Sequence, residues 1–123
     1  MNSVPKKVLV VDDSAPELRL MKQFLEQGGY QAVGISDPTK IEETFEAEQP
    51  SVIMLDVVMP FGSGFQACRE LKGQEAYGTI PVILVTPKTS PSDKYCGEQQ
   101  GANGYVFKPF TPADLLRAVR IFA

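Results

Sequence analysis

The sequence contains no histidine, and this absence removes several classes of enzyme from consideration. Ser-His-Asp and Cys-His catalysis both need an imidazole as general base, and many zinc sites include histidine ligands. Cysteine is also scarce: Cys68 and Cys96 fall in separate predicted helices and have no CxxC spacing. We expect two reduced thiols that pack as small apolar side chains, and the alternative is one disulfide between them.

Clustered positive charge and long apolar runs are absent too. The formal net charge is −3, and the pair Lys6-Lys7 flanks a predicted strand without forming a basic patch of the kind that binds nucleic acid. No apolar run approaches the roughly 18 residues of a membrane helix, and residues 1–7 lack a hydrophobic signal region. We therefore expect a soluble, cytoplasmic protein that binds neither nucleic acid nor membrane.

What the sequence does contain is a regular alternation of strand and helix patterns. Five runs have the composition of strands, at 8–11, 30–35, 52–56, 80–85 and 105–107. Helical patterns follow, beginning near residues 14, 38, 65, 90 and 111. This order predicts an α/β fold, a doubly wound five-stranded parallel sheet with helices on both faces. No linker or repeat divides the chain, so we expect one domain over 1–123, with its core at about 6–122 and no output domain.

Three helices begin with the same pattern of a cap residue, an early proline and an acid three positions after the cap, at 14–17, 90–93 and 111–114. This pattern predicts a capping box, in which the acid returns to the N–H of the cap residue. Apolar residues at helical spacing predict the buried faces of three helices: Leu18, Met21, Phe24 and Leu25, then Ile41, Phe45 and Ala47, then Leu115, Leu116, Val119 and Phe122.

Polar residues stand where the buried strands end: Asp12, Asp13, Asp56, Thr86 and Lys108. In a doubly wound sheet the carboxyl ends of the strands lie along one edge, and ligands bind there. Taken alone, Asp12 or Asp13 is more often a helix cap than a ligand. Three acids, a hydroxyl and an ammonium at four strand ends favour a shared site.

The residue types indicate the chemistry of that site. Three neighbouring carboxylates raise one another's pKa unless a cation is bound. Oxygen ligands without histidine or cysteine suit a hard ion, and Mg²⁺ prefers a few carboxylates together with waters and a phosphate. Lys108 can pair with a carboxylate or a phosphate oxygen, and the Thr86 hydroxyl can donate to a phosphate oxygen. The set predicts phosphoryl transfer to a carboxylate, with Asp56 as the candidate nucleophile.

These residues resemble the receiver domain of bacterial two-component response regulators, the CheY-like family. The matching segments are Val-Asp-Asp-Ser at 11–14, Asp-x-x-Met-Pro-x-x-x-Gly at 56–64, Thr86, Gly-Ala at 101–102, Tyr105 and Lys-Pro at 108–109. The resemblance covers about residues 6–122 and implies strand order 2-1-3-4-5. It also implies a signalling domain rather than an enzyme, which accepts a phosphoryl group on Asp56 from a histidine kinase or a histidine phosphotransfer protein.

The resemblance implies a metal site as well. Asp13 and Asp56 would bind Mg²⁺ (or Mn²⁺) directly, Asp12 would act partly through water, and the Val58 carbonyl would contribute. Thr86 and Tyr105 resemble the switch pair of the family. Their movement would reshape the face of the fourth helix, fifth strand and fifth helix, where a protein partner docks.

Two prolines stand beside these positions. Pro87 follows Thr86 at a position whose N–H helps to bind the phosphoryl group in the family, and proline has no N–H. We therefore expect weaker or differently timed phosphorylation. The Lys108-Pro109 peptide bond would be cis, as in the family. Val-Thr-x-Lys followed by Gly-x-x-Gln-Gly-Ala resembles the stand-alone regulators of twitching motility and phototaxis.

Three other functions remain alternatives. A receiver-like scaffold would dock partners with weak or no phosphorylation. A haloacid-dehalogenase-type phosphatase would need Asp-x-Asp after the first strand, whereas Asp12 and Asp13 are adjacent. A flavodoxin-like flavin binder would need a hydroxyl- and glycine-rich phosphate loop there, where this chain has Asp-Asp-Ser-Ala-Pro-Glu.

Overall fold

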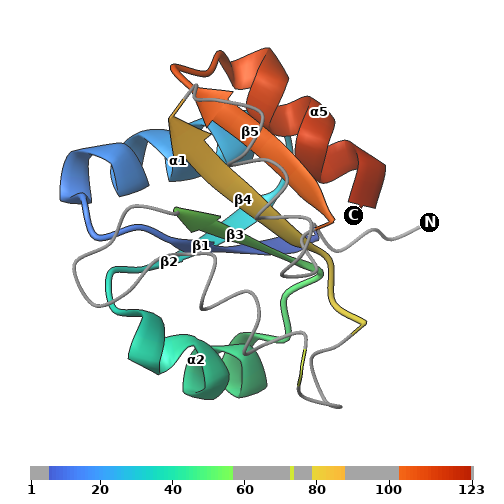
Figure 1. Ribbon diagram of the computed structural model, residues 1–123. Helices are drawn as coiled ribbons and strands as arrows, with labels where there is room; N and C mark the ends of the chain where they lie inside the picture. The colour runs from blue at the N-terminus through green and yellow to red at the C-terminus, as the bar shows by residue number, and fades with distance from the viewer. Residues whose placement is uncertain (1–5, 57–72, 74–78, 88–102, 123) are drawn as a thin grey trace.

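The computed structural model describes residues 6–56, 73, 79–87 and 103–122, and within them the backbone forms one five-stranded sheet. The strands are β1 (Lys7–Val11), β2 (Gln31–Ile35), β3 (Val52–Asp56), β4 (Val82–Pro87) and β5 (Gly104–Lys108). They lie in the order β2-β1-β3-β4-β5, and each neighbouring pair is parallel (Figure 1). The predicted fold class and strand order are both confirmed.

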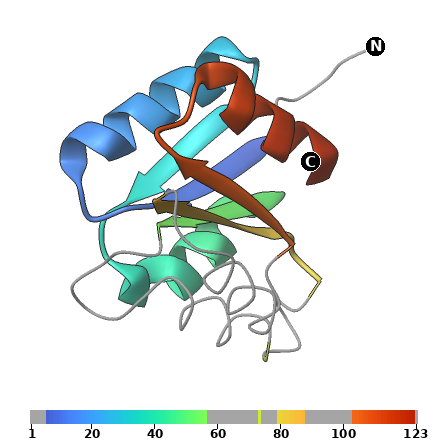
Figure 2. The ribbon, with the colours of Figure 1, turned by 45° about the horizontal axis from the view of Figure 1, so that its top comes forward.

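Helices cover both faces of the sheet. Helices α1 (Ala15–Gln27) and α5 (Pro112–Phe122) lie on one face, and α2 (Ile41–Glu48) lies on the other (Figure 2). Parallel strands with right-handed crossovers are covered in this way. None of the helices among the described residues is long and apolar enough to cross a membrane. The helices predicted near 65–71 and after residue 90 lie outside the described residues, as do Cys68 and Cys96.

The central strands send alternate side chains into two apolar layers. Val8 to Val11 in β1 and Val52 to Leu55 in β3 have no exposed surface. The layer on the α2 side contains Leu9, Val11, Ile41, Phe45, Ile53, Leu55, Val82 and Leu84. The layer on the α1 and α5 side contains Val8, Val10, Met21, Leu25, Val52, Met54, Ile83, Val85, Leu115 and Val119, with Leu18, Phe24, Leu116 and Phe122 partly buried against it. Because helices cover both faces of the sheet, polar side chains that could form a site are expected at the ends of the strands.

The second helical region differs from its prediction in two respects. The expected helix over about 38–48 begins as a 3-10 turn, η1 (Pro38–Lys40), and α2 starts only at Ile41. Ile41 and Phe45 are buried as predicted, but Ala47 is exposed. The inward prediction for Ala47 is wrong because a helix turns about 100° per residue, so a side chain two positions beyond Phe45 points to the opposite side.

The predicted capping box of α5 is confirmed, whereas that of α1 is only half formed. At α5 the Asp114 N–H donates to Thr111 Oγ1 (3.1 Å), and the Thr111 N–H donates to the Asp114 carboxylate (3.0 Å). At α1 the Glu17 N–H donates to Ser14 Oγ (3.5 Å), but the Ser14 N–H donates to Asp12 Oδ1 (2.9 Å). The expected return of the Glu17 carboxylate to Ser14 is therefore wrong, since Asp12 takes that N–H. The third box, at 90–93, lies outside the described residues.

Candidate functional site

Three carboxylates meet at the carboxyl end of the sheet. Asp12 and Asp13 follow β1, Asp56 ends β3, and these two strands are paired neighbours. One carboxylate oxygen from each residue lies within 4.8 Å of those of the other two. Asp12 and Asp56 are buried, whereas Asp13 is exposed. The fold thus brings together three acids, of which the first and the last are 44 positions apart in the sequence.

Asp12 is the acid least well compensated by its surroundings. Its Oδ1 accepts the N–H of Ser14, but its Oδ2 is buried and has no hydrogen-bond partner among the described residues. Burial raises the pKa of Asp12, the Ser14 N–H lowers it, and the nearby negative charges of Asp56 and Glu17 raise it further. The net result is a pKa of about 7. A carboxylate in this position favours binding a proton or a cation.

Lys108 supplies positive charge to this end of the sheet. Its Nζ lies 3.0 Å from Asp56 Oδ1 and 2.5 Å from Glu17 Oε1. Burial lowers the pKa of Lys108, but the hydrogen bonds to Glu17 and Asp56 outweigh burial, and the net pKa is raised. The Lys108-Pro109 peptide bond is cis, as predicted. Glu17 was not among the predicted site residues, because its capping-box position gave it another expected role.

The remaining predicted residues lie on β4 and β5 or cannot be placed. Thr86 is buried near the end of β4, the strand that pairs with β3. Tyr105 is half-buried in β5, and its ring lies parallel to that of Phe107 with centroids 6.3 Å apart. Val58, predicted to offer its carbonyl to a metal, lies outside the described residues.

The three carboxylates fit a hard divalent cation. They supply oxygen ligands within a small volume, one of them has a buried oxygen without a hydrogen-bond partner, and one is open to water. Mg²⁺ and Mn²⁺ are bound by a few carboxylates that leave positions for water and a phosphate. The donor set therefore suits either ion.

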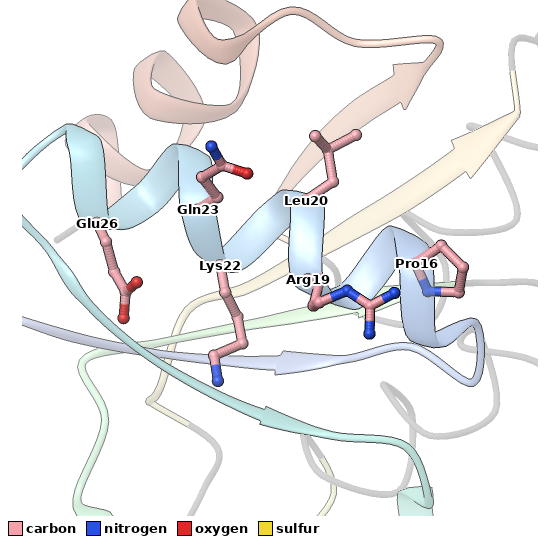
Figure 3. Close-up of a pocket in the computed structure, with 6 residues that line it drawn as sticks. All are labelled: Pro16, Arg19, Leu20, Lys22, Gln23 and Glu26. Carbon is pink, nitrogen blue, oxygen red and sulfur yellow. The ribbon is translucent and has the colours of Figure 1, made fainter.

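Two open hollows on the surface lack all three of these acids. One follows the outer side of α1 and is lined by Pro16, Arg19, Leu20, Lys22, Gln23 and Glu26 (Figure 3). The other lies over β5 and α5, where Tyr105, Phe107, Arg117 and Ile121 are among its lining residues. Neither was predicted from the sequence as a binding site for a small molecule.

The sheet order, with an acidic cluster at its carboxyl end, defines the CheY-like class of α/β proteins. The sequence model of the response regulator receiver domain matches residues 8–120. The chain therefore belongs to the response regulator receiver domain family, which serves two-component signal transduction. The family resemblance found in the sequence is confirmed.

Two relatives illustrate the range of the family. Protein PilH of Pseudomonas aeruginosa is 36% identical over 113 residues, which are 92% of this chain and 93% of PilH. The alkaline phosphatase synthesis transcriptional regulatory protein PhoP of Bacillus subtilis is 35% identical over 115 residues, which are 94% of this chain and 47% of PhoP. The chain thus spans nearly all of PilH but about half the length of PhoP and of several other curated relatives.

Solved structures agree with this assignment. The chemotaxis protein CheY4 of Vibrio cholerae has a TM-score of 0.89 at 31% identity, covering 98% of this chain and 100% of that one. The BeF3-activated DrrB receiver domain has a TM-score of 0.83 at 31% identity and covers 97% of both chains. Both likenesses extend over the whole sheet.

Proposed function

We propose that the chain is a phosphoryl-accepting signalling domain with Asp56 as the acceptor. The observation that carries this proposal is the position of Asp56, a buried carboxylate that contacts the Lys108 ammonium and shares a cluster with Asp12 and Asp13. Receiver domains act with histidine kinases and downstream effectors, so the donor is a histidine kinase or a histidine phosphotransfer protein. The chain is not an enzyme in this proposal, since its chemistry is its own phosphorylation and dephosphorylation.

In the transfer step an Asp56 carboxylate oxygen attacks the phosphorus and forms the new O–P bond. The bond from phosphorus to the donor nitrogen breaks, and the donor keeps the electron pair. Asp12, Asp13 and Asp56, together with the Val58 carbonyl, would hold Mg²⁺ or Mn²⁺. A bound ion of this kind offsets negative charge on phosphoryl oxygens. Lys108 is already at hydrogen-bond distance from Asp56 and donates to a phosphoryl oxygen next to it.

The Thr86 hydroxyl and the Tyr105 ring are the proposed switch. Thr86 is buried near the end of β4, beside the strand that carries Asp56. Tyr105 lies half-buried on the neighbouring β5. Donation from Thr86 to a phosphoryl oxygen would let Tyr105 turn inward. The partner then docks on the face of the fourth helix, β5 and α5, where Phe107 and Ile121 are 40% and 69% exposed. The fourth helix itself lies outside the described residues.

The proposal extends to the setting of the domain. Similarity over 93% of the length of PilH supports a receiver domain over residues 1–123, of the twitching-motility or phototaxis type. Such a domain acts in the cytoplasm through protein partners rather than through nucleic acid or membrane. A receiver-like scaffold that docks partners without phosphorylation is the second reading, and phosphorylation assays separate the two.

Acetyl phosphate with Mg²⁺ is expected to add one phosphoryl group per chain. Intact-mass measurement would show the added group, and its formation should stop when EDTA removes the ion. The same chain without acetyl phosphate is the control. A mass that stays unchanged with Mg²⁺ and acetyl phosphate, together with no binding of beryllium fluoride, would contradict the proposal and favour the scaffold.

Pro87 is expected to slow this reaction, and Pro87→Ala should speed it several-fold. Proline cannot donate an N–H to the phosphoryl group. A hydrogen bond to a charged group contributes about 1.5–3 kcal/mol, and part of this would stabilise the transition state of phosphoryl transfer. The rate of mass gain from acetyl phosphate measures the change. Pro81→Ala, just before the start of β4, is the matched control and should leave the rate as it is. Unchanged phosphorylation and dephosphorylation rates in Pro87→Ala would remove this role.

A further inference from the structure

Lys108 bridges two carboxylates that come from different parts of the fold. Asp56 ends the central strand β3, and Glu17 lies in the first turn of α1, whereas Lys108 ends the edge strand β5. The ammonium lies 3.0 Å from Asp56 Oδ1 and 2.5 Å from Glu17 Oε1, and that Glu17 oxygen is buried. The Glu17 side chain is 26% exposed and the Lys108 side chain 22%. The ammonium therefore contacts two carboxylates at once: it donates a hydrogen bond to Asp56 and forms an ion pair with Glu17.

We propose that Glu17 is a positioning residue that holds the Lys108 ammonium in the resting protein and competes with a phosphoryl group for it. The inference rests on the proposed function of Asp56 as acceptor. It assigns a use to a carboxylate that would otherwise complete the capping box of α1, as Asp114 does at α5.

A count of formal charges gives the direction of the effect. A bound divalent cation and Lys108 together carry three positive charges, which ionised Asp12, Asp13 and Asp56 balance. Glu17 adds one further negative charge at the same ammonium. Phosphorylation makes the acceptor more negative by about one charge, because a phosphoryl group carries about two and the carboxylate carried one. Glu17 therefore opposes the phosphorylated state.

The expected size of the effect follows from distance and exposure. Glu17 and Asp56 contact the same nitrogen, so their oxygens are close enough for direct repulsion. Water and salt screen part of this repulsion because the Glu17 side chain is partly exposed. We expect Glu17→Gln to raise the affinity for a phosphoryl mimic roughly tenfold. Asp56 still orients Lys108 in that variant, so the ammonium keeps one partner at the site.

The first measurement is calorimetric titration of beryllium fluoride at saturating Mg²⁺. Glu17→Gln should bind the mimic roughly ten times more tightly than the wild-type chain. Glu26→Gln is the matched control, since it removes the same charge from an exposed position of the same helix and should leave the affinity within twofold. A glutamate that only stabilised the fold would show no gain in affinity on removal.

The second measurement needs neither metal nor mimic. Urea unfolding in EDTA is compared for Glu17→Gln in the wild-type chain and in the Lys108→Met background. The two effects on the unfolding equilibrium constant should differ by roughly fivefold or more, because only the wild-type chain has the ion pair to lose. Glu26→Gln should have the same effect in both backgrounds.

The outcomes separate the two proposals. If the wild-type chain binds beryllium fluoride with Mg²⁺ and Glu17→Gln binds it equally or more weakly, the competition is overturned while Asp56 keeps its proposed function. Equal effects of Glu17→Gln in both urea backgrounds also overturn it, whatever the mimic does. If the wild-type chain neither binds the mimic nor gains a phosphoryl group from acetyl phosphate, both proposals are overturned.

Discussion

An Asp56→Asn variant is expected to gain no phosphoryl group from acetyl phosphate under conditions that modify the wild-type chain. The amide has the size and shape of the carboxylate, but it is not a nucleophile toward phosphorus, and it cannot form the ion pair with Lys108. The rate of mass gain with Mg²⁺ should fall by at least about a hundredfold, since covalent chemistry is lost rather than weakened. An intact-mass time course of both proteins measures the difference.

Asp37→Asn is the matched control for this loss. Asp37 stands beyond the end of β2, at the same end of the sheet, but it lies outside the acidic cluster. Its Oδ1 accepts the Thr39 N–H at 2.9 Å, and asparagine can keep that hydrogen bond. The control should be phosphorylated at the wild-type rate. A mass gain that persists in Asp56→Asn and maps by peptide sequencing to Asp12 or Asp13 would move the acceptor and contradict the assignment.

An Asp12→Asn variant is expected to be more stable than the wild-type chain without metal, yet to gain much less from Mg²⁺. Burial raises the pKa of Asp12 to about 7 in the folded chain, so ionising it there has a cost that unfolding relieves. Above pH 7 the variant should have a free energy of unfolding about 2–4 kcal/mol higher. With Mg²⁺ the wild-type chain should gain stability through binding, and the variant should lose most of that gain.

The pH dependence has a definite sign. A carboxyl with a raised pKa has no cost while it is protonated in both states, so the wild-type chain should lose stability as pH rises from about 4 to 7. Asp12→Asn should lack this part of the decline. Urea unfolding in EDTA across that range tests it. Asp37 is the opposite case, since the Thr39 N–H and hydroxyl lower its pKa, and Asp37→Asn should remove a contribution that is lost as pH falls. Parallel curves for Asp12→Asn and the wild-type chain would contradict the role of burial.

The fold and most of the acidic cluster could be predicted because both depend on local patterns. Short apolar runs alternating with amphipathic segments leave few arrangements other than a parallel sheet covered on both faces. Once the sheet is parallel, residues that end its strands share one edge, whatever their separation in sequence. Asp12 and Asp56 were placed together by this rule alone, and their burial follows from the apolar strands that deliver them.

Glu17 was missed because its local pattern has two physical outcomes. An acid three residues after Ser14 can return to the Ser14 N–H or leave it to another acceptor. Asp12 Oδ1 takes that N–H, and the Glu17 carboxylate then contacts a lysine that lies 91 positions later in the sequence. The positions of Glu17 and Lys108 in the sequence do not show that Asp12 competes with Glu17 for the Ser14 N–H. Ala47 was misplaced for a simpler reason, since two positions along a helix differ by about 200°, so Ala47 cannot face the same side as the buried Phe45.

The order of the strands determines how Asp56, in the middle of the sheet, is connected to the edge strand β5. Strand β4 lies between β3 and the edge strand β5, and neighbouring strands are about 4.8 Å apart, so the main chains that carry Asp56 and Lys108 are separated by roughly 10 Å. The long lysine side chain spans that gap above the end of β4. A change of charge on Asp56 therefore alters directly an ion pair that belongs to the outermost strand. The same strand carries the half-buried Tyr105 and the exposed Phe107, so one lysine side chain connects the acid at the centre of the sheet to the strand that bears these two rings.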